Sequence, residues 1–164
     1  MRKTEILNQL DTAYHHMAKV AHEVKSKDFY DSINGKWSAA ENLRHLTVSA
    51  KIVNKAFRAP KLALALKFGL KLGKSMTYKD LVKAYQSATR TGFEPRFKSN
   101  STKEKELEEF LIVHNQLSEN IYNWSDGQLN RYQVKHPALG KVSMREIAYF
   151  MIYHIGHHTK PLLS

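Results

Sequence analysis

The chain has 164 residues, which favours one domain with its own buried core, so we expect a single domain over residues 1–164. It contains no cysteine, and this excludes disulfides, thiolate zinc sites, iron–sulfur clusters and a thiol nucleophile. The formal net charge of +11 favours anionic partners, but many proteins are simply basic, and nucleic-acid binding is not the expected role.

The first part of the chain predicts two long helices. Apolar residues recur at spacings of three and four over residues 6–24, which indicates an amphipathic helix. A turn is expected at residues 34–35, where Asn is followed by Gly. The second helix is predicted to begin with a capping box at residues 38–41 and to end near Pro60.

The rest of the chain predicts two more long helices after a basic connection. The connection spans residues 60–100 and contains a shorter helix over 78–89. The third long helix is predicted over 101–121, with its first residue as the cap, and the fourth begins with a capping box at Ser143 and stops at Pro161. No strand-type alternation is found, so the predicted class is all-α, with a four-helix bundle as the architecture.

Apolar segments that could carry the chain into or across a membrane are not evident. The N-terminal residues have no apolar run of the length found in signal peptides. The most apolar stretch, residues 62–72, is interrupted by Lys67 and Lys71 and is too short to span a bilayer. We therefore expect a cytoplasmic protein without a membrane segment.

The fourth predicted helix carries two histidines on its buried stripe. His154 and His158 are four residues apart, so they lie on one face of the helix about one turn from each other. At about 100° per residue they fall close to Ile147 and Met151 on the apolar stripe. Both imidazoles are therefore expected to point into the bundle.

His45 is expected on the apolar side of the second helix, together with Val48 and Ile52. Burying three imidazoles without partners would cost roughly 1–3 kcal/mol each. One divalent metal bound by His45, His154 and His158 would satisfy all three, because neutral imidazole is a good ligand for zinc, nickel, copper or ferrous iron. A polar network of the three histidines in the core is the alternative.

Other histidines are expected to play lesser parts. His114 falls on the core stripe of the third helix, where it is either core filler or a hydrogen-bond partner that orients a ligand, rather than a fourth ligand. His157 lies beside the face of the two ligand candidates and is expected to make only local hydrogen bonds. Four histidines are expected at the surface or in loops: His15, His16, His22 and His136.

Two separated segments carry a resemblance to a known family. They are GKWSAAENLRHL and, far downstream, HPALGKVSMREIAYFMIYHIGHH. Together they resemble the DinB-like superfamily, the DinB/YfiT-type metalloenzymes. The resemblance covers nearly the whole chain, including TYKDLVKAYQ and LSENIYNWSDGQLNRY between the two motifs.

This resemblance implies an up-down-down-up four-helix bundle and a defined set of metal ligands. The histidine of the Trp-Ser…His-Leu motif and two histidines four apart in the last helix correspond to His45, His154 and His158. It also implies metal-dependent thiol transferases or isomerases and frequent homodimers. Many relatives have glutamine three residues after the last ligand, where this chain has Pro161, so the mouth of the site or the end of the helix is expected to differ.

Three hypotheses for function remain open on the sequence. The first is a thiol S-transferase in which a divalent metal (zinc or nickel, with iron as an alternative) activates a low-molecular-weight thiol for attack on a small molecule. Lys67, Lys71 and Lys74 are candidates to attract an anionic thiol, although a solvated helix face explains them better. The second is a metal-dependent hydrolase. The third is a non-catalytic, metal-stabilised module that binds a partner through its basic surface.

Overall fold

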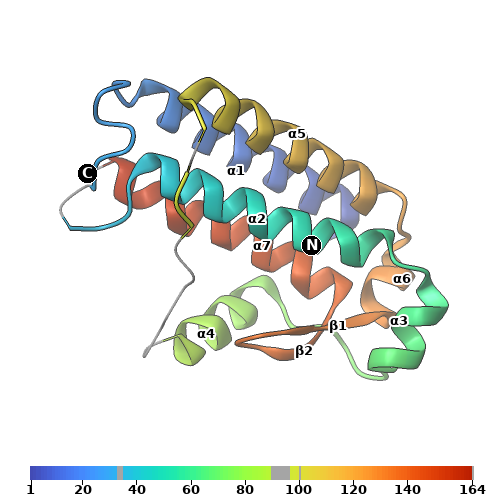
Figure 1. Ribbon diagram of the computed structural model, residues 1–164. Helices are drawn as coiled ribbons and strands as arrows, with labels where there is room; N and C mark the ends of the chain where they lie inside the picture. The colour runs from blue at the N-terminus through green and yellow to red at the C-terminus, as the bar shows by residue number, and fades with distance from the viewer. Residues whose placement is uncertain (33–34, 90–96, 100, 164) are drawn as a thin grey trace.

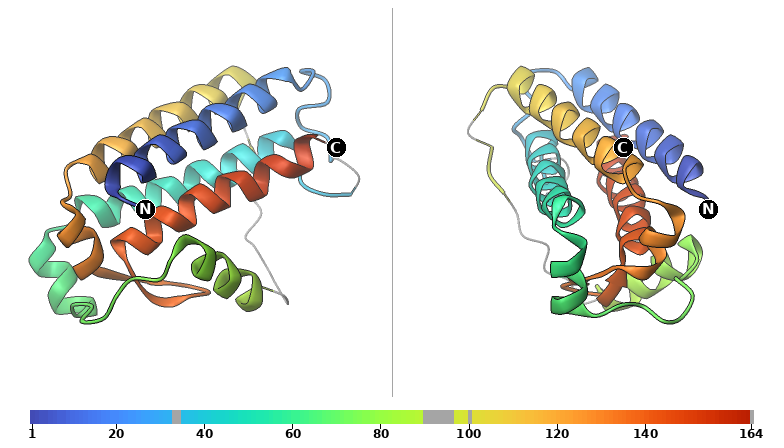
Figure 2. Two further views of the ribbon diagram at one scale, coloured as in Figure 1. Left: turned by 180° about the vertical axis from the view of Figure 1, so that it is seen from behind. Right: turned by 90° about the vertical axis from the view of Figure 1, so that its right-hand side faces the viewer.

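The computed structural model describes residues 1–32, 35–89, 97–99 and 101–163. These residues form seven α-helices, one short 3-10 helix and one two-stranded sheet. Four long helices lie side by side and form the main body of the molecule (Figures 1 and 2). They are α1 (Lys3–Glu23), α2 (Ala39–Arg58), α5 (Lys103–Tyr122) and α7 (Met144–Thr159).

The four long helices pack in a ring. Both α1 and α2 pack against α5 and α7, while α1 and α2 make only a small contact with each other. The apolar stripes face the middle of this ring, as the helical spacing predicted. Side chains with no exposed surface fill it: Ile6, Leu10, Met17, Leu43, Leu46, Phe110, Leu117 and Met151.

Helix caps explain where the long helices begin. The predicted capping boxes at Ser38 and Ser143 are both present, so α2 and α7 start where expected. The predicted start of the third helix at Ser101 is wrong by one residue, because Thr102 is the cap and its side chain accepts from the backbone N–H of Lys105. In the predicted turn at residues 34–35, Asn34 lies outside the described residues, and Gly35 has a φ of 73°.

The connection between α2 and α5 contains two short helices. Pro60 is the cap of α3 (Lys61–Phe68), and α2 ends just before it at Arg58, as predicted. The helix α4 (Tyr78–Ala88) confirms the shorter helix expected over 78–89. In Figure 1 α4 lies along the lower side of α7, beneath the ring of long helices, and it packs against α7.

A small hairpin contradicts the expectation that strands are absent. After α6 (Asp126–Arg131), β1 (Gln133–His136) pairs antiparallel with β2 (Gly140–Ser143), with Val134 opposite Val142. Each strand has only four residues, too few for the alternation to stand out in the sequence. The two valines are buried under the end of the bundle, and this contact holds the hairpin in place.

The C-terminal end of α7 is followed by a 3-10 turn, η1 (Lys160–Leu163), which includes Pro161. The α-helix therefore ends two residues before the proline, close to the predicted stop. No helix in the described part of the chain is long and apolar enough to cross a membrane.

Candidate metal centre

Three histidines meet between α2 and α7. Nε2 of His45 lies 2.9 Å from Nε2 of His154, which in turn lies 3.1 Å from Nε2 of His158. All three side chains are buried, with exposed fractions of 3–4%. The structure thus brings together the three residues that helical spacing placed inside the bundle.

Asn42 determines which ring nitrogen of His158 carries the proton in the neutral imidazole. The amide nitrogen of Asn42 donates to the carbonyl oxygens of Trp37, at 3.2 Å, and Ser38, at 2.8 Å. Its amide oxygen therefore faces Nδ1 of His158, at 2.7 Å, and only a protonated Nδ1 can donate to it. In the neutral ring this leaves the lone pair on Nε2, the atom that faces His154.

Hydrogen bonds cannot satisfy the three facing nitrogens well. Nε2 of His154 contacts the other two rings at once, and a neutral imidazole nitrogen carries either one proton or one lone pair. If it carries the lone pair, it faces the lone pair of His158; if it carries the proton, one hydrogen is divided between two acceptors. A cation that accepts three lone pairs removes this conflict.

The donor set also fits a divalent metal in its spacing. The ligand atoms of His45, His154 and His158 all lie within 4.8 Å of one another. Nitrogens on a tetrahedral zinc ion lie roughly 3.3 Å apart, because each Zn–N bond is about 2.0–2.1 Å long. Three neutral imidazoles would leave open coordination positions, as catalytic sites require.

Aromatic side chains hold the three rings in place. Trp37 packs edge-on against His45, with ring centroids 5.1 Å apart, and stacks on His158 at 5.4 Å. Phe150 stacks on His154 at 4.7 Å. These contacts limit rotation of the three rings.

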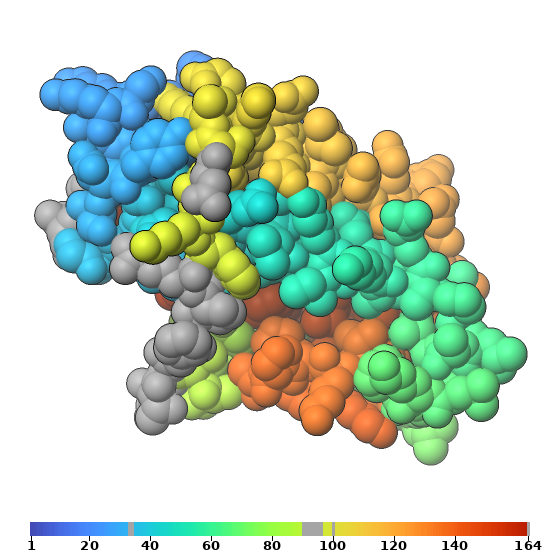
Figure 3. Space-filling view, in the orientation of Figure 1, coloured from blue at the N-terminus to red at the C-terminus, as the bar shows by residue number. Residues whose placement is uncertain are grey.

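Two cavities flank the histidines. A cavity of about 260 Å³ is lined by His45 and His154, with side chains from α2, α4, α7 and the hairpin. A second cavity, of about 290 Å³, is lined by His158 and Asn42 and by Lys36, His157 and Pro161. Figure 3 shows a hollow between α2, in cyan, and the hairpin, in orange, with the dark red α7 at its floor. The cluster can therefore be approached from two sides.

His114 does not join the cluster. It is buried in α5, where Nδ1 lies 2.8 Å from the carbonyl oxygen of Phe110 and the ring packs against Tyr14. Burial lowers the pKa of His114 to about 4, so the ring is neutral at pH 7. Nε2 makes no hydrogen bond within the described chain. His114 is thus the core filler that one of the sequence interpretations expected.

The remaining histidines fall into two groups. His157 is exposed and stacks on Tyr153, and His15, His16 and His22 are exposed along α1. His136 was expected at the surface or in a loop, but it is the last residue of β1, is half-buried, and lines the same cavity as His45 and His154. Spacing could not reveal this, since His136 ends a strand too short to recognise and reaches the cavity through the fold of the hairpin.

Three lysines considered as attractors of an anionic thiol lie elsewhere. Lys71 is bonded to the carboxylate of Glu146, at 2.8 and 3.0 Å. Lys67 lies over the ring of Phe68, and Lys74 lines a different cavity. Neither cavity beside the histidines is lined by any of the three. None of the three lysines therefore stands at the opening of the site, and the less favoured interpretation, attraction of an anionic thiol, finds no support here.

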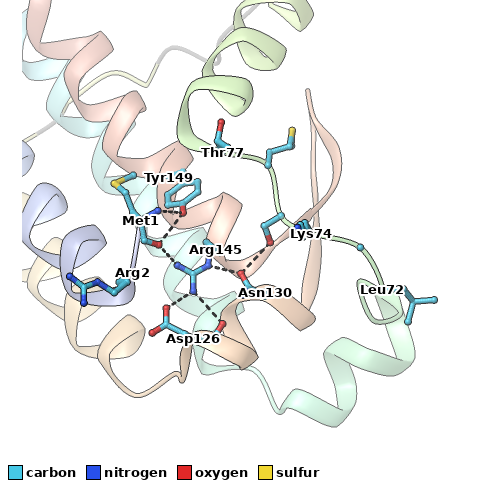
Figure 4. Close-up of a pocket in the computed structure, with 12 residues that line it drawn as sticks. Met1, Arg2, Leu72, Lys74, Thr77, Asp126, Asn130, Arg145 and Tyr149 are labelled. Carbon is cyan, nitrogen blue, oxygen red and sulfur yellow. Dashed lines mark hydrogen bonds and ion pairs between the residues drawn. The ribbon is translucent and has the colours of Figure 1, made fainter.

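The cavity lined by Lys74 lies at the other end of α7 and measures about 560 Å³ (Figure 4). Its most buried charge, Arg145, donates to the carbonyl oxygen of Met1, to Asp126 and to the side chain of Asn130. Figure 4 shows these bonds joining Arg145 to Met1, Asp126 and Asn130, which line the cavity together with it. The arginine therefore joins the start of α7 to α6 and the N-terminal residue, which is a structural role.

Comparisons with known proteins agree with this description. The sequence profile of the DinB superfamily matches residues 9–160. Among solved structures, the chain is similar to YfiT from Bacillus subtilis, described as a probable metal-dependent hydrolase with an unusual four-helix bundle topology. The TM-score is 0.67 at 13% identity, over 98% of this chain and 83% of that chain, so the likeness is one of fold. A search of curated proteins found no significant match. Because the profile spans almost the entire sequence, the chain belongs to the DinB superfamily.

Proposed function

We propose that this protein is a divalent-metal-dependent enzyme whose metal is held by His45, His154 and His158. The observation that carries the proposal is the meeting of three buried imidazole nitrogens at distances of 2.9 and 3.1 Å, with His158 fixed in the tautomer that turns its lone pair inward. Zinc or nickel suits three imidazole ligands, and ferrous iron is a further possibility.

The chain's own residues prepare the site for a nucleophilic reaction. When bound, a divalent ion with three neutral ligands supplies a Lewis acid that lowers the pKa of a water or a thiol. Asn42 holds His158 in its binding tautomer, and Trp37 and Phe150 cover the rings. The apolar cavity beside His45 and His154 excludes water from an electrophile placed there.

Two cavities favour a reaction with two substrates. The cavity beside His158 is bordered by Lys36, whose ammonium would attract the carboxylates of a low-molecular-weight thiol. Among its described lining residues, the cavity beside His45 has no acidic or basic side chain apart from histidine, which suits a neutral electrophile. We therefore place thiol S-transfer first and hydrolysis, the activity ascribed to YfiT, as the alternative.

The alternatives are separated by one set of measurements. Untagged protein purified without a nickel column is analysed for metal beside His154→Ala, and turnover of activated esters and alkyl or aryl halides is followed with and without an added thiol. One metal per chain, lost in the variant, with turnover that needs the thiol and stops on chelation, is the expected result. Turnover without thiol would establish the hydrolase. Metal in neither protein would overturn the proposal.

Two finer features remain predictions that rest on the family resemblance. The up-down-down-up order of the long helices would be tested by an experimental structure. Homodimer formation would be tested by sedimentation equilibrium of the purified protein.

A further inference from the structure

His136 is held in one tautomer by the hairpin. The backbone N–H groups of Ala138 and Leu139 both point at Nδ1 of His136, each at 3.2 Å. A nitrogen that accepts from an N–H must carry its lone pair, so Nδ1 is unprotonated. The single proton of the neutral ring therefore resides on Nε2.

The ring is a neutral hydrogen-bond donor at physiological pH. Burial lowers the pKa of His136 to about 4, so the ring does not become an imidazolium near pH 7. Phe150 and Tyr85 pack against the His136 ring in T-shaped contacts, with ring centroids 4.5 and 5.9 Å away. Within the described residues Nε2 has no hydrogen-bond partner. The donor is thus oriented, and no described residue accepts from it.

The cavity that His136 lines selects for small and mostly apolar molecules. At about 260 Å³ it lies just below the usual 300–1,000 Å³ range of pockets for drug-sized ligands. Among the described residues that line it there is no aspartate, glutamate, lysine or arginine. Its apolar walls come from α2, α4, α7 and the segments beside them: Val48, Ile52, Val53, Phe97, Ala138 and Phe150.

We propose that His136 is a substrate-binding residue, which donates a hydrogen bond from Nε2–H to the carbonyl oxygen of a small, neutral, mainly apolar substrate. The cavity runs from His136 to His45 and His154, so the bound carbonyl compound lies between this donor and the histidine cluster. The inference deepens the proposed function by naming the class of electrophile. Recognition of the carbonyl group by His136 does not itself require the metal, and this allows a separate test.

Two probes of equal size isolate the hydrogen bond. Acetophenone and α-methylstyrene differ only in that a carbonyl oxygen replaces a methylene group, so both suit an apolar cavity and only the first accepts a hydrogen bond. Binding is followed by NMR titration of ¹⁵N-labelled protein, with EDTA present and again with zinc added. Long-range ¹H–¹⁵N spectra of the imidazoles report the tautomer of His136 in the same samples.

His136→Asn provides the matched variant. The asparagine oxygen takes the place of Nδ1 and still accepts from the two backbone N–H groups, as in an Asx turn, so the hairpin is kept. The shorter side chain lacks the outer nitrogen and cannot reach the substrate. His136→Phe makes the opposite change, because it keeps a ring in the cavity and loses both nitrogens.

In the unmodified protein we expect the Nε2–H tautomer and an approximately 3- to 10-fold preference for acetophenone, the value of one neutral hydrogen bond. Both variants should lose the preference while binding α-methylstyrene as before. A preference that persists in His136→Asn would overturn the proposal, as would the Nδ1–H tautomer or failure of both probes to shift resonances of the cavity residues. Loss of metal from the protein would instead count against the proposed function, since the probes are also measured without metal.

Discussion

The amide oxygen of Asn42 lies 2.7 Å from Nδ1 of His158, and this contact selects which nitrogen of His158 faces the other two histidines. Asn42 lies about one turn before His45 on α2, so a single helix supplies one of the three candidate ligands and orients another. The two hydrogen bonds that Asn42 donates to Trp37 and Ser38 fix its amide in turn. The start of α2 and the geometry of the cluster are therefore coupled.

Replacing Asn42 with alanine should weaken metal binding by roughly 10- to 100-fold, the usual effect of removing a group that orients a metal-bound histidine. The reason is that His158 would lose the acceptor that keeps its proton on Nδ1. The dissociation constant for zinc can be measured at pH 7 by competition with a chromophoric chelator.

Asn54→Ala is the matched control for that experiment. Asn54 is also buried on α2, donates to the carbonyl oxygen of Val113 at 2.9 Å and accepts from Asn120 at 2.8 Å, but it does not contact the histidines. We expect this variant to lose stability and to keep its zinc affinity. Equal losses of affinity in the two variants would show that Asn42 acts through stability alone.

Added zinc should raise the melting temperature of the chelator-treated protein, because only the folded state brings the three ligands together. At a free zinc concentration of 100 times the dissociation constant, the gain in unfolding free energy is about 2.7 kcal/mol. His154→Ala should show almost none of this gain, and His157→Ala, whose side chain is exposed, should show all of it. A zinc effect that survives in His154→Ala but vanishes in His157→Ala would assign the ligands differently.

The buried His114 should make the protein less stable in mild acid. Its pKa is about 4 in the folded state and about 6.5 when unfolded, so the unfolded chain binds the additional proton. Stability from this residue is complete above pH 6.5 and is lost as the pH falls toward 4, by about 2 kcal/mol between pH 7 and pH 5. Urea unfolding with EDTA present measures the change without interference from the metal.

His114→Leu should reduce that pH dependence by the same amount. At pH 7 its stability should lie within about 1 kcal/mol of the original, because leucine is apolar and the change also removes the buried Nε2 that has no partner among the described residues. An unchanged slope in the variant would mean that other groups cause the loss in acid.

The partly buried ion pair between Lys71 and the fully buried Glu146 should be important for stability. Burial raises the pKa of Glu146, but hydrogen bonds from Lys71 and from the backbone of Met76 and Ser143 outweigh it, so the pKa lies below its ordinary value. Glu146→Ala leaves Lys71 and two backbone N–H groups without their acceptor, and we expect a loss of about 3–5 kcal/mol in unfolding free energy.

Lys71→Met gives the comparison for Glu146→Ala. It should cost less, because Glu146 keeps both backbone donors and the lysine side chain is 19% exposed. Chemical denaturation of the two variants and of the double variant yields the coupling between the side chains. A coupling near zero would show that the backbone hydrogen bonds of Glu146 carry the whole effect.

The long helices and the histidine cluster were predictable because each depends on local spacing. The i, i+4 separation of His154 and His158 determines that they share a face, and the apolar stripe determines which way that face points. The same spacing argument, applied to α2, predicted that His45 faces the core. The distance between α2 and α7, and therefore the contact of the three rings, depends on how the helices pack and was seen only in the structure.

Features that depend on the connecting segments were not predictable in this way. His136 enters the cavity because a four-residue strand turns back at Gly140, whose φ is 70°. Lys71 was a candidate to attract a thiol, with a solvated helix face as the favoured interpretation, but it forms an ion pair with Glu146, which is 75 positions away in sequence. Such pairings follow from where the connection crosses the bundle, and no short-range pattern encodes that path.

The separation of the ligands along the chain has a consequence for biosynthesis. His45 and His154 touch although they are 109 positions apart. A nascent chain that has been translated only as far as α5 carries one of the three ligands, so it cannot hold the ion tightly. If the three histidines hold a metal as proposed, loading would follow translation of α7 and its docking against α2. The ion bound in a cell would then be set by what is available at that late step, rather than by what the growing chain meets first.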